Sequence, residues 1–216
     1  MSVKRIAKSI SFFFFLCLMT VSLGGCGLMP FPSQEDSLTA ENDVLAGQSA
    51  DTEASERVTV GSYLSIEDID NRLQLLDNKD ALSADGLYYA AWTIGDSIPY
   101  ENSEGDTVDL YDAQLYLLAG EFKDAQTAQN NMDLWLAAGK ENYDVTEEKT
   151  ITCNGCSYTL INYNCVNEEN PYARGTSAFG VYKDSAVCIE LTCREQFIDD
   201  LESILTDFLE HCVYAE

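Results

Sequence analysis

Cysteine is the residue type in this sequence whose number and spacing most favour chemistry. Eight cysteines occur in the 216 residues, and the C-terminal third of the chain holds six of them. In a protein outside the cytoplasm an even number of cysteines predicts disulfides, and six cysteines allow 15 connectivities. The six candidates for three disulfides are Cys153, Cys156, Cys165, Cys188, Cys193 and Cys212.

Cys153 and Cys156 flank the dipeptide Asn154-Gly155. Asn-Gly between two strand-like runs predicts a hairpin with a type I′ turn, because both turn residues need a positive φ. The two cysteines then face each other at about 5.5 Å between Cα atoms, which is within the range of a disulfide. We therefore predict this pair as the first disulfide.

Geometry also limits how the other four cysteines can pair. Cys193 and Cys212 are expected at opposite ends of one helix, about 28 Å apart by helical rise, so they cannot bond to each other. An extended stretch separates Cys188 from Cys193, which argues against a bond between those two. Cys165 is then expected to pair with Cys188, Cys193 or Cys212, and the sequence leaves this choice open.

Two other kinds of cysteine chemistry fit the same residues less well. A redox dithiol at the Cys-Asn-Gly-Cys motif of residues 153–156 needs its attacking cysteine at a helix N-terminus, where the helix dipole lowers the thiol pKa. This motif lies on a predicted hairpin instead. A zinc site could combine the motif with Cys188 and Cys193, but their spacing is loose and an oxidising exterior favours disulfides.

An acidic loop is predicted between residues 95 and 107, with the sequence GDSIPYENSEGDT. Connections longer than about 12 residues are uncommon and often functional. Its oxygen-bearing side chains are of the kind that calcium prefers, although their spacing does not match an EF-hand. A calcium-binding loop is therefore a candidate beside the simpler prediction of a solvated loop. The residues concerned are Asp96, Glu101, Asn102, Glu104 and Asp106.

Composition and missing motifs argue against most enzymes and against nucleic-acid binding. The chain has 12 basic and 37 acidic residues and a net charge of −25, so its surface should repel phosphate backbones. Its single histidine, His211, lies near the end of a predicted helix, where a cation suits the helix dipole. The sequence contains no Gly-x-Ser-x-Gly, Ser-x-x-Lys, His-Glu-x-x-His or Walker motif. We therefore expect a protein that acts by binding and without catalysis.

Hydrophobic patterns predict the elements that position these residues. Helical spacing and capping residues predict three helices: one near 66–77, one from Asp124 to about Lys140, and a closing helix opened by a capping box at 192–195. Alternating or aromatic-rich runs predict strands at 87–94, 108–118, 148–153, 156–166, 176–182 and 185–191. This order predicts an α+β domain over 58–216, in which amphipathic helices cover an antiparallel sheet.

The N-terminus has the pattern of a secretory signal. Residues 1–9 carry Lys4, Arg5 and Lys8 without any acid, and an almost entirely apolar run follows at 10–23. This run would span about 21 Å as a helix, which is short of the roughly 30 Å hydrocarbon core of a bilayer. A signal peptide is therefore a better prediction than a permanent transmembrane helix.

The apolar run ends in Leu-Gly-Gly-Cys at 23–26, which resembles the lipobox of bacterial lipoproteins. The resemblance implies that residues 1–25 are removed and that Cys26 carries a diacylglycerol. Residues 33–56 then contain seven acids, no cation and no aromatic residue, so we predict a disordered tether over 26–57. The expected location is the extracytoplasmic face of the cell membrane, with the lipid anchor as the only membrane contact.

The order of elements from about residue 87 onward also resembles the Mog1/PsbP-like domains of some bacterial surface lipoproteins. That resemblance implies a fold but no shared catalytic site. The sequence thus predicts a lipid-anchored extracytoplasmic protein that binds an unidentified ligand. The alternatives are a thiol–disulfide redox protein and a protein that binds calcium or zinc.

Overall fold

A computed structural model describes residues 57–79, 86–102, 105–166 and 170–215. The predicted signal peptide, the lipidation site Cys26 and all of the predicted tether except Arg57 lie outside the described residues. Within the described part of the chain, no helix is both long and apolar enough to cross a membrane. The described residues thus fall almost entirely within the predicted domain at 58–216.

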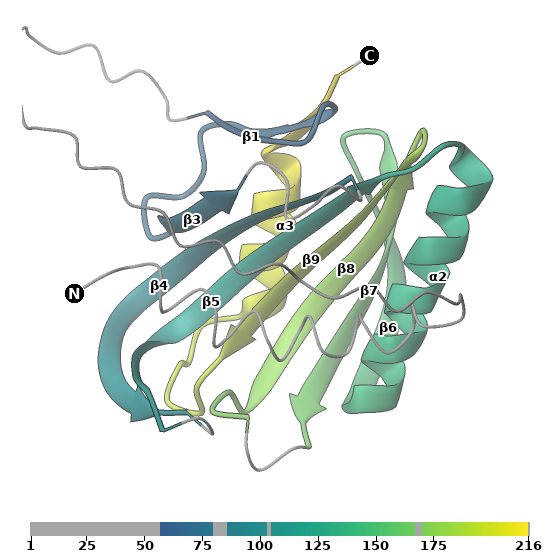
Figure 1. Cartoon of the computed structure of the whole chain (residues 1–216). Coiled ribbons are helices and arrows are strands. Elements are labelled where there is room, and N and C mark those ends of the chain that lie inside the picture. The colour runs from purple at the N-terminus through teal and green to yellow at the C-terminus, as the bar shows by residue number, and fades with distance from the viewer. Residues whose placement is uncertain (1–56, 80–85, 103–104, 167–169, 216) are drawn as a thin grey trace, which may run out of the picture.

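Ten strands form two antiparallel sheets in the described residues. They are β1 Val58–Val60, β2 Leu64–Ile66, β3 Gln74–Lys79, β4 Leu87–Glu101, β5 Thr107–Glu121, β6 Tyr143–Cys153, β7 Cys156–Cys165, β8 Arg174–Tyr182, β9 Ser185–Cys193 and β10 Cys212–Tyr214. The large sheet has the order β3-β4-β5-β9-β8-β7-β6, and every pair of neighbours is antiparallel (Figure 1). The small sheet has the order β1-β2-β10, so it joins the first and last described elements.

Tight turns connect neighbouring strands of the large sheet. Asn154 and Gly155 join β6 to β7 with φ values of 48° and 77°, the pair of positive values that a type I′ turn requires. Lys183, with a φ of 54°, and Asp184 join β8 to β9. The predicted Asn154-Gly155 hairpin is confirmed, and the strands predicted at 176–182 and 185–191 form a second hairpin.

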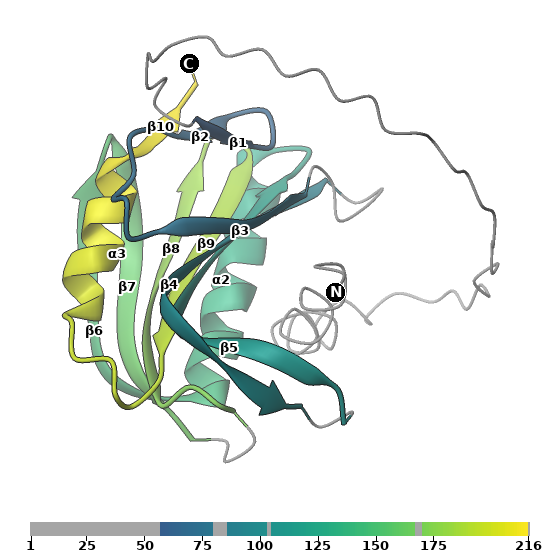
Figure 2. The same cartoon turned by 90° about the vertical axis from the view of Figure 1, so that its left-hand side faces the viewer.

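Two helices pack on opposite faces of the large sheet (Figure 2). Helix α2, Ala125–Asn142, contacts β6, β8 and β9 on one face, and helix α3, Leu201–Glu210, contacts the same strands on the other face. Asp124 caps α2 by accepting a hydrogen bond from the backbone N–H of Thr127 at 2.7 Å. This predicted cap is confirmed.

Strand β9 is buried along its whole length because it lies between the two helices. Val187, Ile189 and Leu191 belong to the core on the α3 side, whereas Ala186 and Cys188 belong to the core beneath α2. Successive side chains point to opposite faces of a sheet, so a strand covered on both faces needs apolar residues at almost every position. The long apolar run of this strand therefore reflects its central place.

The predicted fold class is wrong. The described residues form a mainly antiparallel β-structure whose two helices contact β6, β8 and β9 of the large sheet, and not an α+β fold in which helices cover the whole sheet. The helix expected near 66–77 is absent, because β2 and β3 occupy that region. A short segment gains little from helical propensity alone. Here β2 pairs with β1 and β10, and β3 pairs with β4, and this pairing overrides the helical spacing of the apolar residues.

The closing helix also begins later than predicted. Thr192 and Cys193, expected to open the helix, end strand β9, where Thr192 pairs with Gln114 of β5. Helix α3 instead begins after Asp200, whose carboxylate accepts from the backbone N–H groups of Glu202 and Ser203. The capping-box pattern at 192–195 is a local signal, and pairing within the sheet overrides it.

Candidate functional site

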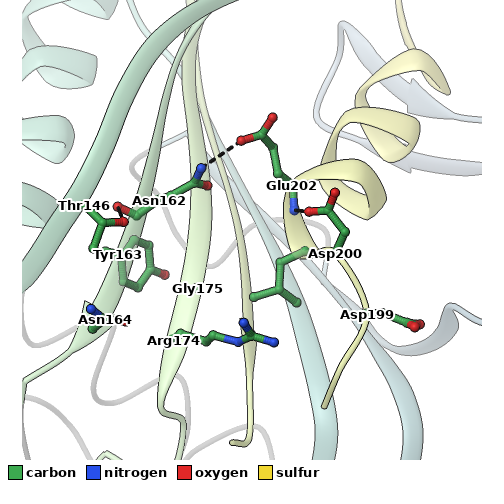
Figure 3. Close-up of a pocket in the computed structure, with 10 residues that line it drawn as sticks. Thr146, Asn162, Tyr163, Asn164, Arg174, Gly175, Asp199, Asp200 and Glu202 are labelled. Carbon is green, nitrogen blue, oxygen red and sulfur yellow. Dashed lines mark hydrogen bonds between the residues drawn. The ribbon is translucent and has the colours of Figure 1, made fainter.

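A polar pocket of about 260 Å³ lies between the large sheet and the start of α3 (Figure 3). We call it the β7–α3 pocket. Strand β7 forms its central wall, β6 and β8 contribute at the sides, and the first turn of α3 with the two preceding residues forms the opposite wall. Its lining residues are Thr146, Asn162, Tyr163, Asn164, Arg174, Gly175, Asp199, Asp200, Leu201 and Glu202.

Strand alternation places two amides of β7 on the pocket side. Asn162 and Asn164 share one face of the strand, and Tyr163 between them belongs to the core beneath α2. Arg174 pairs with Asn164 at the start of β8. Its Nη2 donates to the backbone oxygen of Phe197 at 2.7 Å, so this side chain fastens the segment before α3 to the sheet.

Glu202 is the most firmly held carboxylate of the pocket. Its Oε1 accepts from Lys149 Nζ at 2.5 Å, and its Oε2 accepts from Asn162 Nδ2 at 2.7 Å. The hydrogen bond from Lys149, followed by the one from Asn162, lowers the pKa of Glu202 below its usual value. This carboxylate therefore stays charged at neutral pH and is unsuited to deliver a proton.

The other two acidic residues of the pocket also have partners. Asp200 caps α3, as described above, and Asp199 Oδ2 accepts from Arg72 Nη1 at 2.8 Å. Arg72 comes from the segment before β3, so this contact ties the N-terminal part of the domain to the start of α3. The three carboxylates thus shape the wall of the pocket and are already engaged.

The polar groups that remain available come from the sheet. The buried Oδ1 of Asn162 has no hydrogen-bond partner in the described structure, although its Nδ2 is bonded to Glu202. The amide of Asn164 is exposed at the pocket and makes no side-chain hydrogen bond to the described residues. Together with the remaining N–H groups of Arg174, these amides offer donors and acceptors within one hollow. Such a set suits a ligand with several hydroxyl or amide groups.

Comparison with known proteins provides no family for this chain. No family model matches the sequence, and no curated protein matches it. Among solved structures, cyanobacterial PsbP from Synechocystis sp. PCC 6803 is 12% identical with a TM-score of 0.35, over 65% of this chain and 99% of that one. The extracellular domain of PknH from Mycobacterium tuberculosis is 13% identical with a TM-score of 0.32, over 59% of this chain and 66% of that one. Similarities of this extent carry no argument about function.

The structure gathers some of the predicted cysteines and separates others. All six described cysteines are unbonded. Cys153, Cys156, Cys193 and Cys212 belong to the core on the α3 side, whereas Cys188 and Cys165 belong to the core beneath α2. Among the residues that the structure describes, no group of three or more cysteine, histidine or acidic side chains is arranged to hold a metal ion.

The predicted acidic loop is for the most part a pair of strands. Strand β4 continues to Glu101 and β5 begins at Thr107, so Asp96 and Glu101 lie on a strand and Asp106 lies in the turn. Asp96 donates its backbone N–H to Asp112, and Asp106 donates its own to Asn102. Glu104 lies outside the described residues. Asp96 and Glu101 are five positions apart along an extended strand, about 16 Å, so the structure does not bring these two carboxylates together.

Glu190 is a buried carboxyl group that the sequence analysis did not single out. It lies in the middle of β9 and is only 4% exposed. Tyr163 donates its hydroxyl to Glu190 Oε1 at 2.5 Å, and Ser177 Oγ donates to the hydroxyl of Tyr163 at 3.3 Å. Burial raises the pKa of Glu190. A lone acid inside an otherwise apolar strand was the available signal, because a buried acid needs a partner.

A second hollow, of about 650 Å³, lies between β3 and the segment that follows β2. Trp92 forms part of its wall, and the buried indole N–H of this residue has no hydrogen-bond partner in the described structure. The remaining lining is mostly apolar or belongs to the turn at 68–71, where Asp70 is already bonded to Arg72. Asp68, Asn71 and Gln74 add polar side chains to its lining.

Proposed function

We propose that this protein is a lipid-anchored extracytoplasmic binding protein that takes a hydroxyl-rich ligand, such as a saccharide, in the β7–α3 pocket. The supporting observation is the unpaired, buried Oδ1 of Asn162 beside the amide of Asn164 and the guanidinium of Arg174. A buried acceptor without a partner is unfavourable, and a ligand hydroxyl that donates to it removes that cost.

The chemistry of the pocket favours binding over catalysis. Its carboxylates are engaged as a helix cap, in an ion pair and in hydrogen bonds, and the pKa of Glu202 is lowered. A general acid at neutral pH needs a raised pKa. The residues that line the pocket also include no cysteine and no histidine. The side chains of the β7–α3 pocket can therefore bind and orient a polar ligand.

The placement of the pocket also suits an anchored protein. Strand β1, where the predicted tether enters the domain, lies in the small sheet with β2 and β10 at one end of the molecule, and α3 begins toward the other end (Figure 2). The start of α3, which lines the pocket, therefore lies away from the strand at which the predicted tether enters the domain. Because the mature chain is strongly acidic, anionic lipid would repel the domain and keep it off the bilayer.

The test is a thermal-shift comparison of residues 27–216 with the Asn164→Ala variant, using saccharides, peptides and divalent cations as separate sets. A saccharide that binds the folded state raises the melting temperature, by an amount equivalent to about 2.7 kcal/mol at a hundredfold excess over Kd. Loss of one hydrogen bond, about 0.5–1.5 kcal/mol, predicts that Asn164→Ala binds roughly two- to tenfold more weakly.

Asn130→Ala provides the matched control, because Asn130 is an exposed amide on α2, remote from the pocket. It should bind the saccharide as the unmodified chain does. The proposal fails if no saccharide shifts the melting temperature, or if Asn164→Ala binds as tightly as the control. A shift produced by cations alone would instead support the metal-binding alternative.

A further inference from the structure

Two cysteines of the β6–β7 hairpin and a third from the distant strand β10 meet at one end of the large sheet. Cys153 and Cys156 are paired in register across the two-residue turn that joins β6 to β7. Both belong to the core on the α3 side, and Cys212 belongs to the same core. Residues paired in this way have Cα atoms about 5.5 Å apart, which is within the range that a disulfide spans.

The third cysteine is brought to the hairpin by α3 and β10. Asn154, in the turn between the first two cysteines, donates its Nδ2 to the backbone oxygens of Glu210 at 2.7 Å and Cys212 at 2.9 Å. Two positions further along each strand, the hydroxyls of Tyr158 and Tyr214 are hydrogen-bonded. Since residues two apart lie on one face of a strand, Cys156 of β7 lies on the face turned toward Cys212.

The other described cysteines are too far from this group to bond with it. Tyr158 pairs with Gly180 of β8, and Gly180 pairs with Val187 of β9. Cys193 lies six residues beyond Val187, about 20 Å along the strand and away from the hairpin. This exceeds the roughly 7 Å limit between Cα atoms joined by a disulfide.

Cys165 and Cys188 are excluded in the same way. Cys165 lies nine residues along β7 from Cys156, about 30 Å, and both Cys165 and Cys188 belong to the core beneath α2, on the opposite face of the sheet. The group is therefore limited to three thiols. One disulfide can form within it, and one thiol must remain beside that disulfide.

We propose that Cys153, Cys156 and Cys212 form a disulfide-exchange site, in which Cys156 is bonded either to Cys153 or to Cys212 and the third cysteine is a thiol. The disulfide forms when two of these thiols are oxidised by a small-molecule disulfide, which is reduced to two thiols. Exchange starts when deprotonated Cys212 attacks the sulfur of Cys156. The bond between Cys156 and Cys212 forms, the bond between Cys153 and Cys156 breaks, and Cys153 leaves as a thiolate that takes up the proton lost by Cys212.

The surroundings make this exchange slow. Burial raises the pKa of all three thiols, so little thiolate is present at neutral pH. Redox enzymes of the thioredoxin type depend on a lowered thiol pKa. This site therefore serves to fasten the C-terminal strand to the β6–β7 hairpin, or to release it, and does not turn over substrates. An oxidising compartment follows from the proposed location, whereas the bonding pattern depends only on the fold.

The test uses the mature chain, extracted from membranes, and equilibrates it with mixtures of reduced and oxidised glutathione. Remaining thiols are alkylated after acid quenching and unfolding, and linked peptides are identified by mass spectrometry. Among Cys153, Cys156 and Cys212, we expect two fewer alkylated cysteines in the oxidised chain than in the reduced chain. The linked peptides should join Cys156 to Cys153 in one fraction of the molecules and to Cys212 in another.

Single variants separate the two bonds. Cys212→Ser should leave only the bond between Cys153 and Cys156, Cys153→Ser should leave only the bond between Cys156 and Cys212, and Cys156→Ser should abolish both. Cys193→Ser, a buried cysteine of the same core, is the matched control and should leave both bonds. Circular dichroism checks that each variant folds.

Three results would overturn the proposal. They are a full set of alkylated thiols after oxidation, a bond from this group to Cys165, Cys188 or Cys193, and a single bond that persists unchanged in the unmodified chain at every glutathione ratio. Because the mapping of the unmodified chain is decisive alone, a variant that fails to fold does not prevent the test. If the protein were instead purified from the cytosol, the same mapping would still test the three-cysteine site. It would thereby separate an error in the proposed location from an error in the proposed site.

Discussion

At the scale of single residues, Glu190 is the most unusual side chain of the core. It is almost fully buried on β9, where Tyr163 donates a hydrogen bond to it and Ser177 donates to that tyrosine. Burial raises its pKa, so the folded state binds the proton of Glu190 more tightly than the unfolded state does. Its contribution to stability is therefore complete below the unfolded pKa, near 4.3, and is lost as the pH rises through the folded pKa.

Glu190→Gln should remove this pH dependence while keeping an acceptor for Tyr163. Each unit by which the folded pKa is raised corresponds to about 1.4 kcal/mol. We expect the variant to gain free energy of unfolding relative to the unmodified chain between pH 4.5 and 7. Urea unfolding at several pH values measures this difference.

The comparison must be made as a difference, because other groups act in the opposite direction. The pKa values of Asp112 and Glu202 are lowered mainly by hydrogen bonds from Arg194 and Lys149, so the stability that they contribute is lost as the pH falls. These groups are present in both chains and cancel. If the free energy of unfolding depended on pH in the same way in both chains, the pKa of Glu190 would not differ between the folded and unfolded states, and the prediction would be wrong.

At the scale of elements, one glycine allows β7 and β9 to interact across β8. Gly175 of β8 pairs with Tyr163 of β7 and with Thr192 of β9. The ring of Tyr163 crosses over Gly175 to reach Glu190, and a Cβ atom at position 175 would lie 2.5 Å from its Cζ. The ring of Tyr163 can therefore occupy this position only because residue 175 has no side chain.

Gly175→Ala should therefore displace Tyr163 and disrupt its hydrogen bond to Glu190 and its stacking on Tyr143, whose ring centroid is 4.0 Å away. Overpacking of this kind destabilises proteins by about 1–3 kcal/mol. A lower denaturant midpoint with an unchanged slope is the expected result in urea unfolding.

Gly139→Ala is the matched glycine variant. Gly139 lies in the last turn of α2, where a Cβ atom would meet Phe179 and Ile161 at 3.4 and 3.6 Å, which are ordinary contacts. Alanine is favoured over glycine within a helix by up to about 1 kcal/mol, so this variant should be slightly more stable. Equal losses of stability in both variants would contradict the role given to the space above Gly175.

At the scale of the whole molecule, the proposed function depends on attachment at one residue. Cys26→Ser removes the only proposed site of lipid attachment, and a lipid with two acyl chains is what holds such a protein stably in a membrane. We expect the unmodified chain to be found in the membrane fraction at the mass of residues 26–216 plus lipid. The variant should give no membrane-bound form of that mass, as measured by fractionation and intact-mass analysis.

Cys17→Ser is the control, because Cys17 lies within the segment that is expected to be removed. It should be processed and anchored like the unmodified chain. A Cys26→Ser protein that stays in the membrane fraction at the mature mass would disprove anchoring at this residue.

The sequence by itself determined the local features of this protein. The Asn154-Gly155 turn, the strand register that places Cys153 opposite Cys156 and the Asp124 cap depend on neighbours within a few residues, where φ preferences and strand alternation decide the outcome. The prediction of a helix at 66–77 was wrong because it used only a local pattern. The pairing of β2 with β10 joins residues far apart in the sequence, and together with the pairing of β3 with β4 it overrode that pattern.

Only the tertiary structure decided which distant residues meet. The approach of Cys212 to the β6–β7 hairpin, the β7–α3 pocket and the partners of Glu190 all depend on contacts between residues far apart in the sequence, up to 58 positions for Asn154 and Cys212. Such contacts follow from the order of strands in the sheet and from the packing of α2 and α3 on its two faces. Periodicity along the chain specifies which face a side chain occupies, but not which strand becomes its neighbour.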